Sequence, residues 1–186
     1  RGTSVDTIRF TTNDPDNTTV SIPVSGTGVV TTKLSLDLDR SPGNQEVTTQ
    51  SARGGESLYV ALYAEQAAHL QRNDVELAFD SDVLQFARFN SSYAEESNLL
   101  NSEGSSATHF AQLNSASTLA ITGALPTSGV TGDGLMGHVT FIIDPTVGSG
   151  PTTVAVQQAI LQSLEMSLPD TLGSFPAATV NLQPTL

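Results

Sequence analysis

The stretch DVELAFDSDVLQF, residues 74–86, decides the fold class of this chain. In its first half, apolar side chains at Val75, Leu77 and Phe79 alternate with polar or small ones. Period-two alternation predicts a β-strand with one buried face. An Asp-Ser-Asp segment follows at 80–82, and apolar residues return directly after it. Asp and Ser side chains bond the backbone of turns, so the stretch predicts a strand, a turn and an apolar segment that packs back.

Short apolar segments of the same kind recur along the chain. They lie at 5–10, 20–24, 34–38, 57–64, 108–113, 118–122, 139–143, 152–161 and 179–182. Turn formers separate them, among them Arg-Gly-Gly-Glu at 53–56 and a glycine-punctuated loop at 129–137. Residues 93–100 favour one or two helical turns, with Glu95 and Glu96 suited to the N-terminus. Many short strands without a long amphipathic helix predict an all-β fold: a two-sheet jelly-roll/Greek-key β-sandwich with an N-terminal β-hairpin extension.

The charge balance argues against two classes of partner. The 186 residues carry a formal net charge of −12, and Lys33 is the one lysine. Such a surface repels phosphate backbones and anionic lipid headgroups, which predicts no nucleic-acid partner. No apolar run approaches the roughly 20 residues that span a bilayer, which predicts no membrane insertion.

Composition also bears on location. The chain has no cysteine, hence no disulfide framework and no thiolate chemistry. It begins at Arg1 without a methionine or a signal peptide, which predicts a processed or excised segment. Its richness in Thr, Ser, Asn and Gly, with a single lysine, is typical of exported proteins. We therefore expect an extracellular or cell-surface protein of bacterial origin.

Residues 1–30 predict a β-hairpin that forms a first unit, with residues 31–186 as the second. Its apolar side chains are Val5, Ile8, Phe10, Val20, Ile22 and Val24, on either side of a turn at 13–17. A lone hairpin is marginally stable, so we expect its apolar face to dock on something. The stretch TTNDPDNTTVSIPVSGTG, residues 11–28, resembles the last two strands of immunoglobulin-like repeats in large bacterial surface proteins. The resemblance implies the tail of such a repeat, or a donor-strand element that completes a sheet elsewhere.

Four motifs of the second unit resemble a cohesin-type domain in their order. They are LSLDLD at 34–39, the Gly-Gly-Glu turn leading into SLYVALYA at 57–64, the stretch at 74–86, and GVTGDGLMGHVTFII at 129–143. The resemblance, to cellulosomal cohesins and similar carbohydrate-binding-module-like sandwiches, covers residues from about 33 to 183. It implies a jelly-roll module without catalytic activity. Cellulosomal cohesins hold calcium-loaded dockerin modules on one sheet face; no dockerin-contact residue carries over by motif, because that face varies.

The residues needed for catalysis are not grouped in the sequence. His69, His109 and His138 lie in different segments, and none forms a His-x-x-x-His pair. A Gly-x-Ser-x-Gly elbow is absent from the sequence, and Gly132-Asp133-Gly134 lacks the lysine and helix of a phosphate-binding loop. We therefore predict a protein that is not an enzyme, with no catalytic, cofactor-binding or metal-binding residues and no cofactor.

Calcium stays open as an alternative to the absence of a metal. Asp37, Asp39, Ser41 and Gly43 alternate as in the first half of a calcium-binding loop. Against a calcium site, Pro42 occupies the position of the loop glycine and no glutamate stands at the twelfth position. Strand alternation and turn formation explain the same acidic residues, as they do for the pair Asp80 and Asp82.

Tyr59 and Tyr63 are predicted on the same face of the 57–64 strand. Two tyrosines in a row form a flat strip on which sugar rings stack in carbohydrate-binding sandwiches. Packing beneath a loop or against a neighbouring segment is the favoured interpretation, because tryptophan is absent from the chain.

Three functions remain in view. The leading hypothesis is a non-catalytic extracellular interaction or assembly module whose partner is another protein, such as a dockerin-like module, bound on a sheet face. The alternative is a subunit of an extracellular filament or surface structure, in which the hairpin of residues 1–30 adds its strands to a sheet edge of another copy of the chain. The third is a carbohydrate-binding module, which keeps polysaccharide open as a partner.

Overall fold

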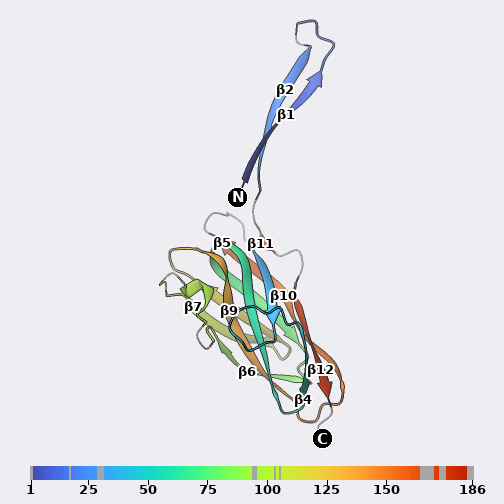
Figure 1. Cartoon of the computed structure of the whole chain (residues 1–186), viewed down its shortest axis with the longest axis vertical. Coiled ribbons are helices and arrows are strands. Elements are labelled where there is room, and N and C mark those ends of the chain that lie inside the picture. The colour runs from blue at the N-terminus through green and yellow to red at the C-terminus, as the bar shows by residue number, and fades with distance from the viewer. Residues whose placement is uncertain are drawn as a thin grey trace. The chain divides into compact units, whose positions relative to one another are not determined.

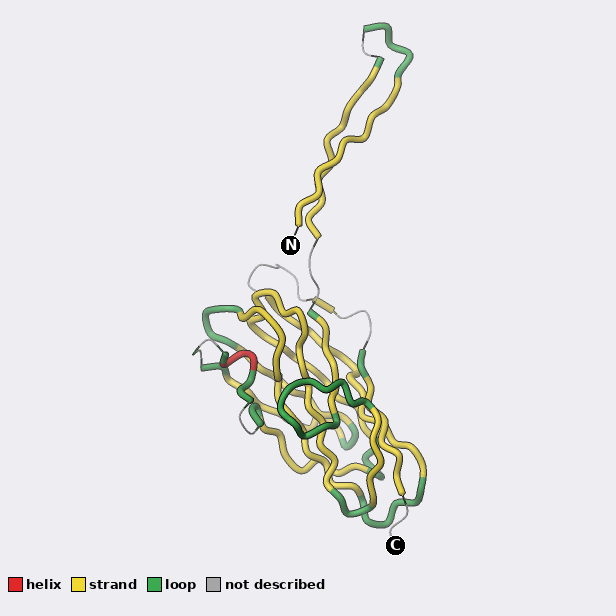
Figure 2. Tube along the Cα trace, in the orientation of Figure 1, coloured by secondary structure: helices red, strands yellow, loops and turns green. Residues whose placement is uncertain are grey.

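The computed structural model describes residues 2–16, 18–28, 32–93, 96–102, 104, 106–163, 170–171 and 175–183 (Figure 1). The chain divides into two compact units, Arg1–Val30 and Thr31–Leu186. Figure 2 shows that strands make up almost all of the regular structure in both. No helix among these described residues is long and apolar enough to cross a membrane.

The first unit is a hairpin of β1 (Gly2–Thr11) and β2 (Thr19–Gly28). The strands pair antiparallel in continuous register, with Ile8 opposite Ile22. In the connecting turn, the Asp14 carboxylate accepts a hydrogen bond of 2.9 Å from the backbone N–H of Asp16. Asn17, which the sequence also places in this turn, lies outside the described residues.

The register gives the hairpin one apolar face. Directly opposite residues of an antiparallel pair share a face, and on this one the apolar side chains are 38–50% exposed. They are Ile8, Phe10, Val20, Ile22 and Val24. Val5 lies on the other face, opposite Ser25, and is 71% exposed. The hairpin therefore carries a continuous apolar strip that its own two strands leave exposed.

The second unit is a sandwich of two strand layers. The first layer contains β3 (Lys33–Asp37), the first half of β5 (Ser57–Phe79), β9 (Val130–Ile143) and β6 (Leu84–Asn90). The second contains β4 (Thr49–Arg53), β12 (Ala177–Gln183), β10 (Gly150–Ser163), the second half of β5, β8 (Thr118–Ala124) and β7 (Thr108–Ser115), with β11 (Asp170–Thr171) beside β10. The prediction of an all-β sandwich is confirmed.

The core lies between the layers. Phe79 in the second half of β5 and Phe141 in β9 have ring centroids 4.8 Å apart, so the two layers touch there. The predicted inward residues Val75, Leu77 and Phe79 are all buried in the main core cluster. At the end of β5 the Asp80 carboxylate accepts a hydrogen bond of 3.0 Å from the Asp82 N–H. The predicted turn thus returns the chain into β6.

Strand β5 passes from one layer to the other. Sequence patterns predict separate strands at 57–64 and from 74 onward, but the structure has one strand of 23 residues. Gln66 and His69 have positive φ angles of 55° and 53°, and the register with β9 shifts between Ala64 and Ala67 and between Ala67 and Leu70. Bulges of this kind increase the local twist and bend a strand. They let β5 pair with β3 and β9 first, and then with β8 and β10.

Two other expectations were wrong. The stretch 129–137 is not a loop, because β9 begins at Val130 and includes all of it but Gly129. Gly132 and Gly137, at φ angles of 119° and 134°, act as irregular strand positions that only glycine adopts readily. Within the described part of 93–100, the only helix is a 3₁₀ turn, η1 (Leu99–Asn101), and Glu95 lies outside the described residues. The Asn98 side chain caps this turn by accepting a hydrogen bond from the Leu100 N–H.

Candidate interaction face

The face of the first layer that points away from the core carries its own cluster of side chains. Along β5, Leu58, Val60 and Leu62 belong to the main core. The alternating residues Tyr59, Ala61 and Tyr63 form a second buried cluster with Leu135 of β9, against which Tyr93 packs. We call the outer surface of β3, the first half of β5, β9 and β6 the interaction face.

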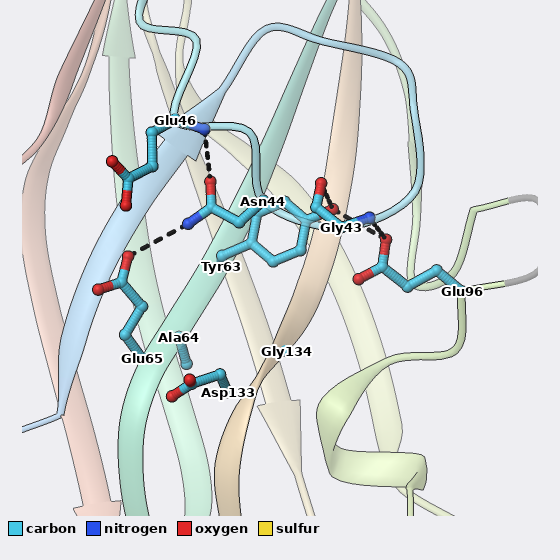
Figure 3. A pocket seen from close by; sticks show the side chains of 9 residues that line it. All are labelled: Gly43, Asn44, Glu46, Tyr63, Ala64, Glu65, Glu96, Asp133 and Gly134. Atoms are coloured by element: carbon cyan, nitrogen blue, oxygen red, sulfur yellow. Dashed lines mark hydrogen bonds between the residues drawn. The ribbon is translucent and has the colours of Figure 1, made fainter.

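Tyr63 is held by a loop that crosses this face (Figure 3). Its hydroxyl lies 2.9 Å from the Gly43 carbonyl oxygen and 2.9 Å from Glu96 Oε2. Glu96 Oε2 also accepts a hydrogen bond of 2.8 Å from the Gly43 N–H. Burial, and then the hydrogen bond to the Glu96 carboxylate, raise the pKa of the Tyr63 phenol. One carboxylate therefore joins the loop at Gly43 to the sheet.

The same loop is anchored at its base by Asp37, whose side chain is completely buried. One carboxylate oxygen accepts the Asp39 N–H at 2.8 Å and the other accepts the Gln45 N–H. Asp39 in turn accepts the Ser41 N–H at 2.6 Å. These carboxylates are turn-forming groups, which is the alternative that the sequence offered to a calcium loop. Among the described residues, no group of three or more His, Asp or Glu side chains is arranged to hold a metal; the calcium alternative remains a prediction.

An acidic hollow of about 390 Å³ lies beside Tyr63 (Figure 3). Its carboxylates are those of Glu46, Glu65, Glu96 and Asp133. Glu65 Oε1 accepts a hydrogen bond of 3.2 Å from the Asn44 side chain, and Asp133 Oδ1 accepts one of 2.6 Å from the Gln66 N–H. The remaining carboxylate oxygens face a cavity in which a positively charged group would be stabilised.

A basic hollow of about 350 Å³ lies beside Tyr59 on the same face. Its base consists of Tyr59 from β5 with His138 and Thr140 from β9, and its charged residues are Arg40 and Arg88. Tyr59 is the direct cross-strand partner of Thr140, and His138 is that of Asn90 in β6. Strand register therefore brings this set together.

Aromatic contacts build the base of the basic hollow. The ring of Tyr59 stacks on His138 at 4.5 Å between centroids, and Tyr93 meets the His138 ring edge-on at 5.2 Å. The Arg40 guanidinium carbon is 5.7 Å from the centre of the Tyr59 ring, within cation–π range. Burial, with a smaller effect of the nearby Arg88 charge, lowers the pKa of His138 to about 4, so this imidazole is neutral at pH 7.

Three polar atoms at the base of the basic hollow have no hydrogen-bond partner among the residues that the structure describes. They are Tyr59 Oη, His138 Nδ1 and Thr140 Oγ1, and each is buried. A buried donor or acceptor left without a partner costs about 1–3 kcal/mol. Such groups in a native fold call for an explanation, and a bound ligand or water is one.

The predicted tyrosine pair is confirmed in position. Tyr59 and Tyr63 do share a face, but they are only 6% and 4% exposed. The interpretation of these two residues as a flat, exposed strip for sugar stacking is therefore wrong. Tyr63 packs beneath the Gly43 loop, as the favoured interpretation had it, and Tyr59 packs against His138 and Tyr93.

The charged residues of both hollows were missed by sequence reasoning. Arg40 and Glu96 lie in connecting segments and Arg88 lies in β6, far from Tyr59 and His138 in the chain. The three histidines are on separate strands: His69 at the bend of β5, His109 in β7 and His138 in β9. The one usable signal was the strand alternation that placed Tyr59 and Tyr63 together on one face of their strand.

Comparison with known proteins identifies the architecture. No protein-family model matches the sequence, and neither does a curated protein. Among solved structures, the cohesin module of a family 33 glycoside hydrolase from Clostridium perfringens superposes with a TM-score of 0.62, over 83% of this chain and 98% of that module, at 8% identity. This chain has a cohesin-like fold.

Other cohesins agree with this cohesin-like fold. The sixth cohesin of scaffoldin B from Acetivibrio cellulolyticus, solved in complex with the Cel5 dockerin, has a TM-score of 0.60 at 15% identity, over 83% of this chain and 100% of that one. A non-cellulosomal cohesin from the archaeon Archaeoglobus fulgidus has a TM-score of 0.58 at 14% identity, over 82% and 91%. The sequence resemblance to cohesins is thus confirmed at the level of the fold.

Proposed function

We propose that the cohesin-like unit is a non-catalytic module for protein–protein interaction, and that its partner binds on the interaction face. The observation that carries the proposal is the cohesin-like fold itself. The similar structures include four cohesin–dockerin complexes from Acetivibrio cellulolyticus and Clostridium thermocellum. A dockerin-like module is accordingly the first partner to test.

The charge pattern of the interaction face supports the same proposal. Tyr59 belongs to the basic hollow and Tyr63 to the acidic hollow. Tyr63 lies four positions after Tyr59 along the strand, a rise of about 13 Å. Opposite charges at a defined spacing orient a partner and exclude partners with the wrong charge pattern. We propose an extracellular or cell-surface bacterial setting, which the composition and the cohesin resemblance support.

The experiment maps a partner onto the face. The full chain is used to isolate binding proteins from the medium and cell surface of its source organism, and each purified protein is then titrated by calorimetry. Charge reversal at Arg88→Glu or Glu65→Lys should weaken binding at least tenfold. Arg53→Glu, on β4 of the other layer, is the matched control and should bind as the parent chain does. Binding that is lost only in Arg53→Glu would reject the interaction face.

The hairpin supports a second candidate function, self-assembly. Its five apolar side chains stay 38–50% exposed on one face, which is unusual for a stable isolated element. A second copy of the chain would pair the main chain of one of its sheet edges with β1 or β2, and its core side chains would cover the apolar strip. Because the two contacting surfaces differ, repetition of the contact builds an open filament when the rotation between successive copies does not close a ring.

The test removes the apolar strip and keeps the hairpin. In Ile8→Thr/Ile22→Thr, a directly opposed pair loses its apolar character but keeps β-branched side chains that favour strands. The control, Arg9→Thr/Ser21→Thr, changes the adjacent opposed pair on the other face. Assembly measured by sedimentation and negative-stain imaging should disappear in the first variant and persist in the second. Equal assembly by both, or by a chain lacking residues 1–30, would reject the hairpin as the contact.

A further inference from the structure

The basic hollow combines cationic side chains with buried hydrogen-bonding atoms for which the described residues supply no partner. We infer that it is a binding site for a carboxylate group, namely an acidic side chain of the protein that the interaction face binds. The inference rests on the proposed function for its choice of partner, and on the structure of the hollow for its choice of chemistry.

The basic hollow is positively charged, whereas the chain as a whole carries a net negative charge. The protein has only seven Lys and Arg residues against nineteen Asp and Glu, yet Arg40 and Arg88 both line this one hollow. The described residues that line it include no Asp or Glu. The Arg40 guanidinium donates a hydrogen bond of 3.1 Å to the Ser57 carbonyl oxygen, which holds it at the rim. Among the described lining residues no carboxylate neutralises its charge, so a ligand can do so.

The buried atoms at the base are suited to donate. The Asn90 side-chain nitrogen lies 2.9 Å from His138 Nε2. An amide nitrogen donates, so Nε2 accepts and the hydrogen-bond network assigns the ring proton to Nδ1. His138 Nδ1–H, the Tyr59 hydroxyl and the Thr140 hydroxyl are then three donors that have no acceptor in the described part of the chain. A carboxylate only accepts hydrogen bonds, at about four lone-pair sites, and an Arg guanidinium pairs with it directly.

The neighbouring acidic hollow favours a protein as the source of the carboxylate. A polypeptide surface presents an Asp or Glu and, about 13 Å away, a Lys or Arg, which fits both hollows of the interaction face at once. An acidic polysaccharide carries only the negative group, and the carboxylates of Glu65 and Glu96 would repel its next charge. The two hollows together therefore match a protein with paired charges.

The test uses small capped amino acids with the full chain. Glutamate acetylated at its nitrogen and amidated at its backbone carboxyl is titrated against the isotope-labelled protein, and the side-chain signals of His138, Arg40 and Arg88 are followed by NMR. We expect saturable shifts at these groups with capped glutamate and none with capped glutamine. Arg40→Gln and Arg88→Gln should each weaken the binding at least fivefold, while Arg53→Gln leaves it unchanged. Tyr59→Phe should also weaken it, without unfolding the protein, because the phenyl ring retains the stacking.

Each outcome separates the inference from the proposed function. Equal shifts with capped glutamine, or binding that is insensitive to Arg40→Gln and Arg88→Gln, would overturn the carboxylate site even if a partner binds elsewhere on the face. Glucuronate binding at the same residues with higher affinity than capped glutamate would overturn the protein as the source. Specific binding of capped glutamate, together with a partner that maps to the other layer, would support the site and reject the proposed function.

Discussion

The hydroxyl of Tyr63 lies 2.9 Å from the carboxylate of Glu96, across 33 residues of sequence. The same carboxylate oxygen accepts the Gly43 N–H, and the Tyr63 hydroxyl also contacts the Gly43 carbonyl oxygen. These contacts therefore tie together, at one point, strand β5, the loop at Gly43 and the segment after β6. This tie sets the position of the loop that borders the acidic hollow on the interaction face.

Removing the Tyr63 hydroxyl should release the loop. In Tyr63→Phe, the Gly43 carbonyl and the Glu96 carboxylate lose a shared partner, so we expect the free energy of unfolding to fall by about 1–2 kcal/mol. Denaturant unfolding measures this change, and amide hydrogen exchange at 40–46 should become faster. The control is Tyr59→Phe on the same strand face, whose hydroxyl has no hydrogen-bond partner among the described residues. Its stability should stay equal or rise, and an equal loss in both variants would contradict the role of the tie.

Asp37 should be essential to the base of the loop. Its two carboxylate oxygens each accept a backbone N–H, so an amide group in Asp37→Asn would place its own donor against one of them. We expect a loss of about 1–3 kcal/mol in unfolding free energy. Asp39→Asn retains the oxygen that accepts the Ser41 N–H, and should change stability by less than about 0.5 kcal/mol. If the unfolding free energy depends on added calcium and not on the substitution, that result would support the calcium alternative.

The buried imidazole of His138 should make stability depend on pH. Burial lowers its pKa to about 4 in the folded protein, against 6.5 for the free side chain. Between these values the unfolded chain binds the additional proton, so stability is complete above pH 6.5 and falls as the pH drops toward 4. His138→Gln should show a flatter decline of Tm over this window. An NMR titration that places the His138 pKa near 6.5 would refute the burial effect.

Gly137 should not tolerate a side chain. A Cβ atom there would lie 2.6 Å from the Phe89 ring, and its φ angle of 134° is unfavourable for other residues. We expect Gly137→Ala to lower the unfolding free energy by about 2–4 kcal/mol, because steric overlap adds to backbone strain. Gly55→Ala, at a φ angle of 83° with no neighbour within 4 Å, carries the backbone cost alone. Its unfolding free energy, obtained from thermal or denaturant unfolding, should fall by about 1–2 kcal/mol.

Short-range patterns explain which parts of the fold the sequence predicted. The alternation at 75–79 and 57–64 depends only on the geometry of an extended chain, so it holds whichever sheet the strand joins. The turn at 80–82 depends on a bond between Asp80 and the N–H two residues later. The irregular positions of β9, in contrast, depend on pairing with a distant strand. The glycines at 132 and 137 have the sequence signature of a loop, and only pairing with β5 makes them part of strand β9.

The sequence by itself determined the all-β class, the apolar face of each strand, the separate hairpin pattern of 1–30 and the likeness to cohesins. The first three follow from residues within a few positions of one another, and the likeness to cohesins follows from the order of four such motifs along the chain. Tertiary structure alone decided that Arg40, Arg88, Tyr59 and His138 meet in one hollow and that Glu96 reaches Tyr63. The reason is that cross-strand register and loop placement are set when the whole core is buried. Local propensities contain no information about which distant strands become neighbours.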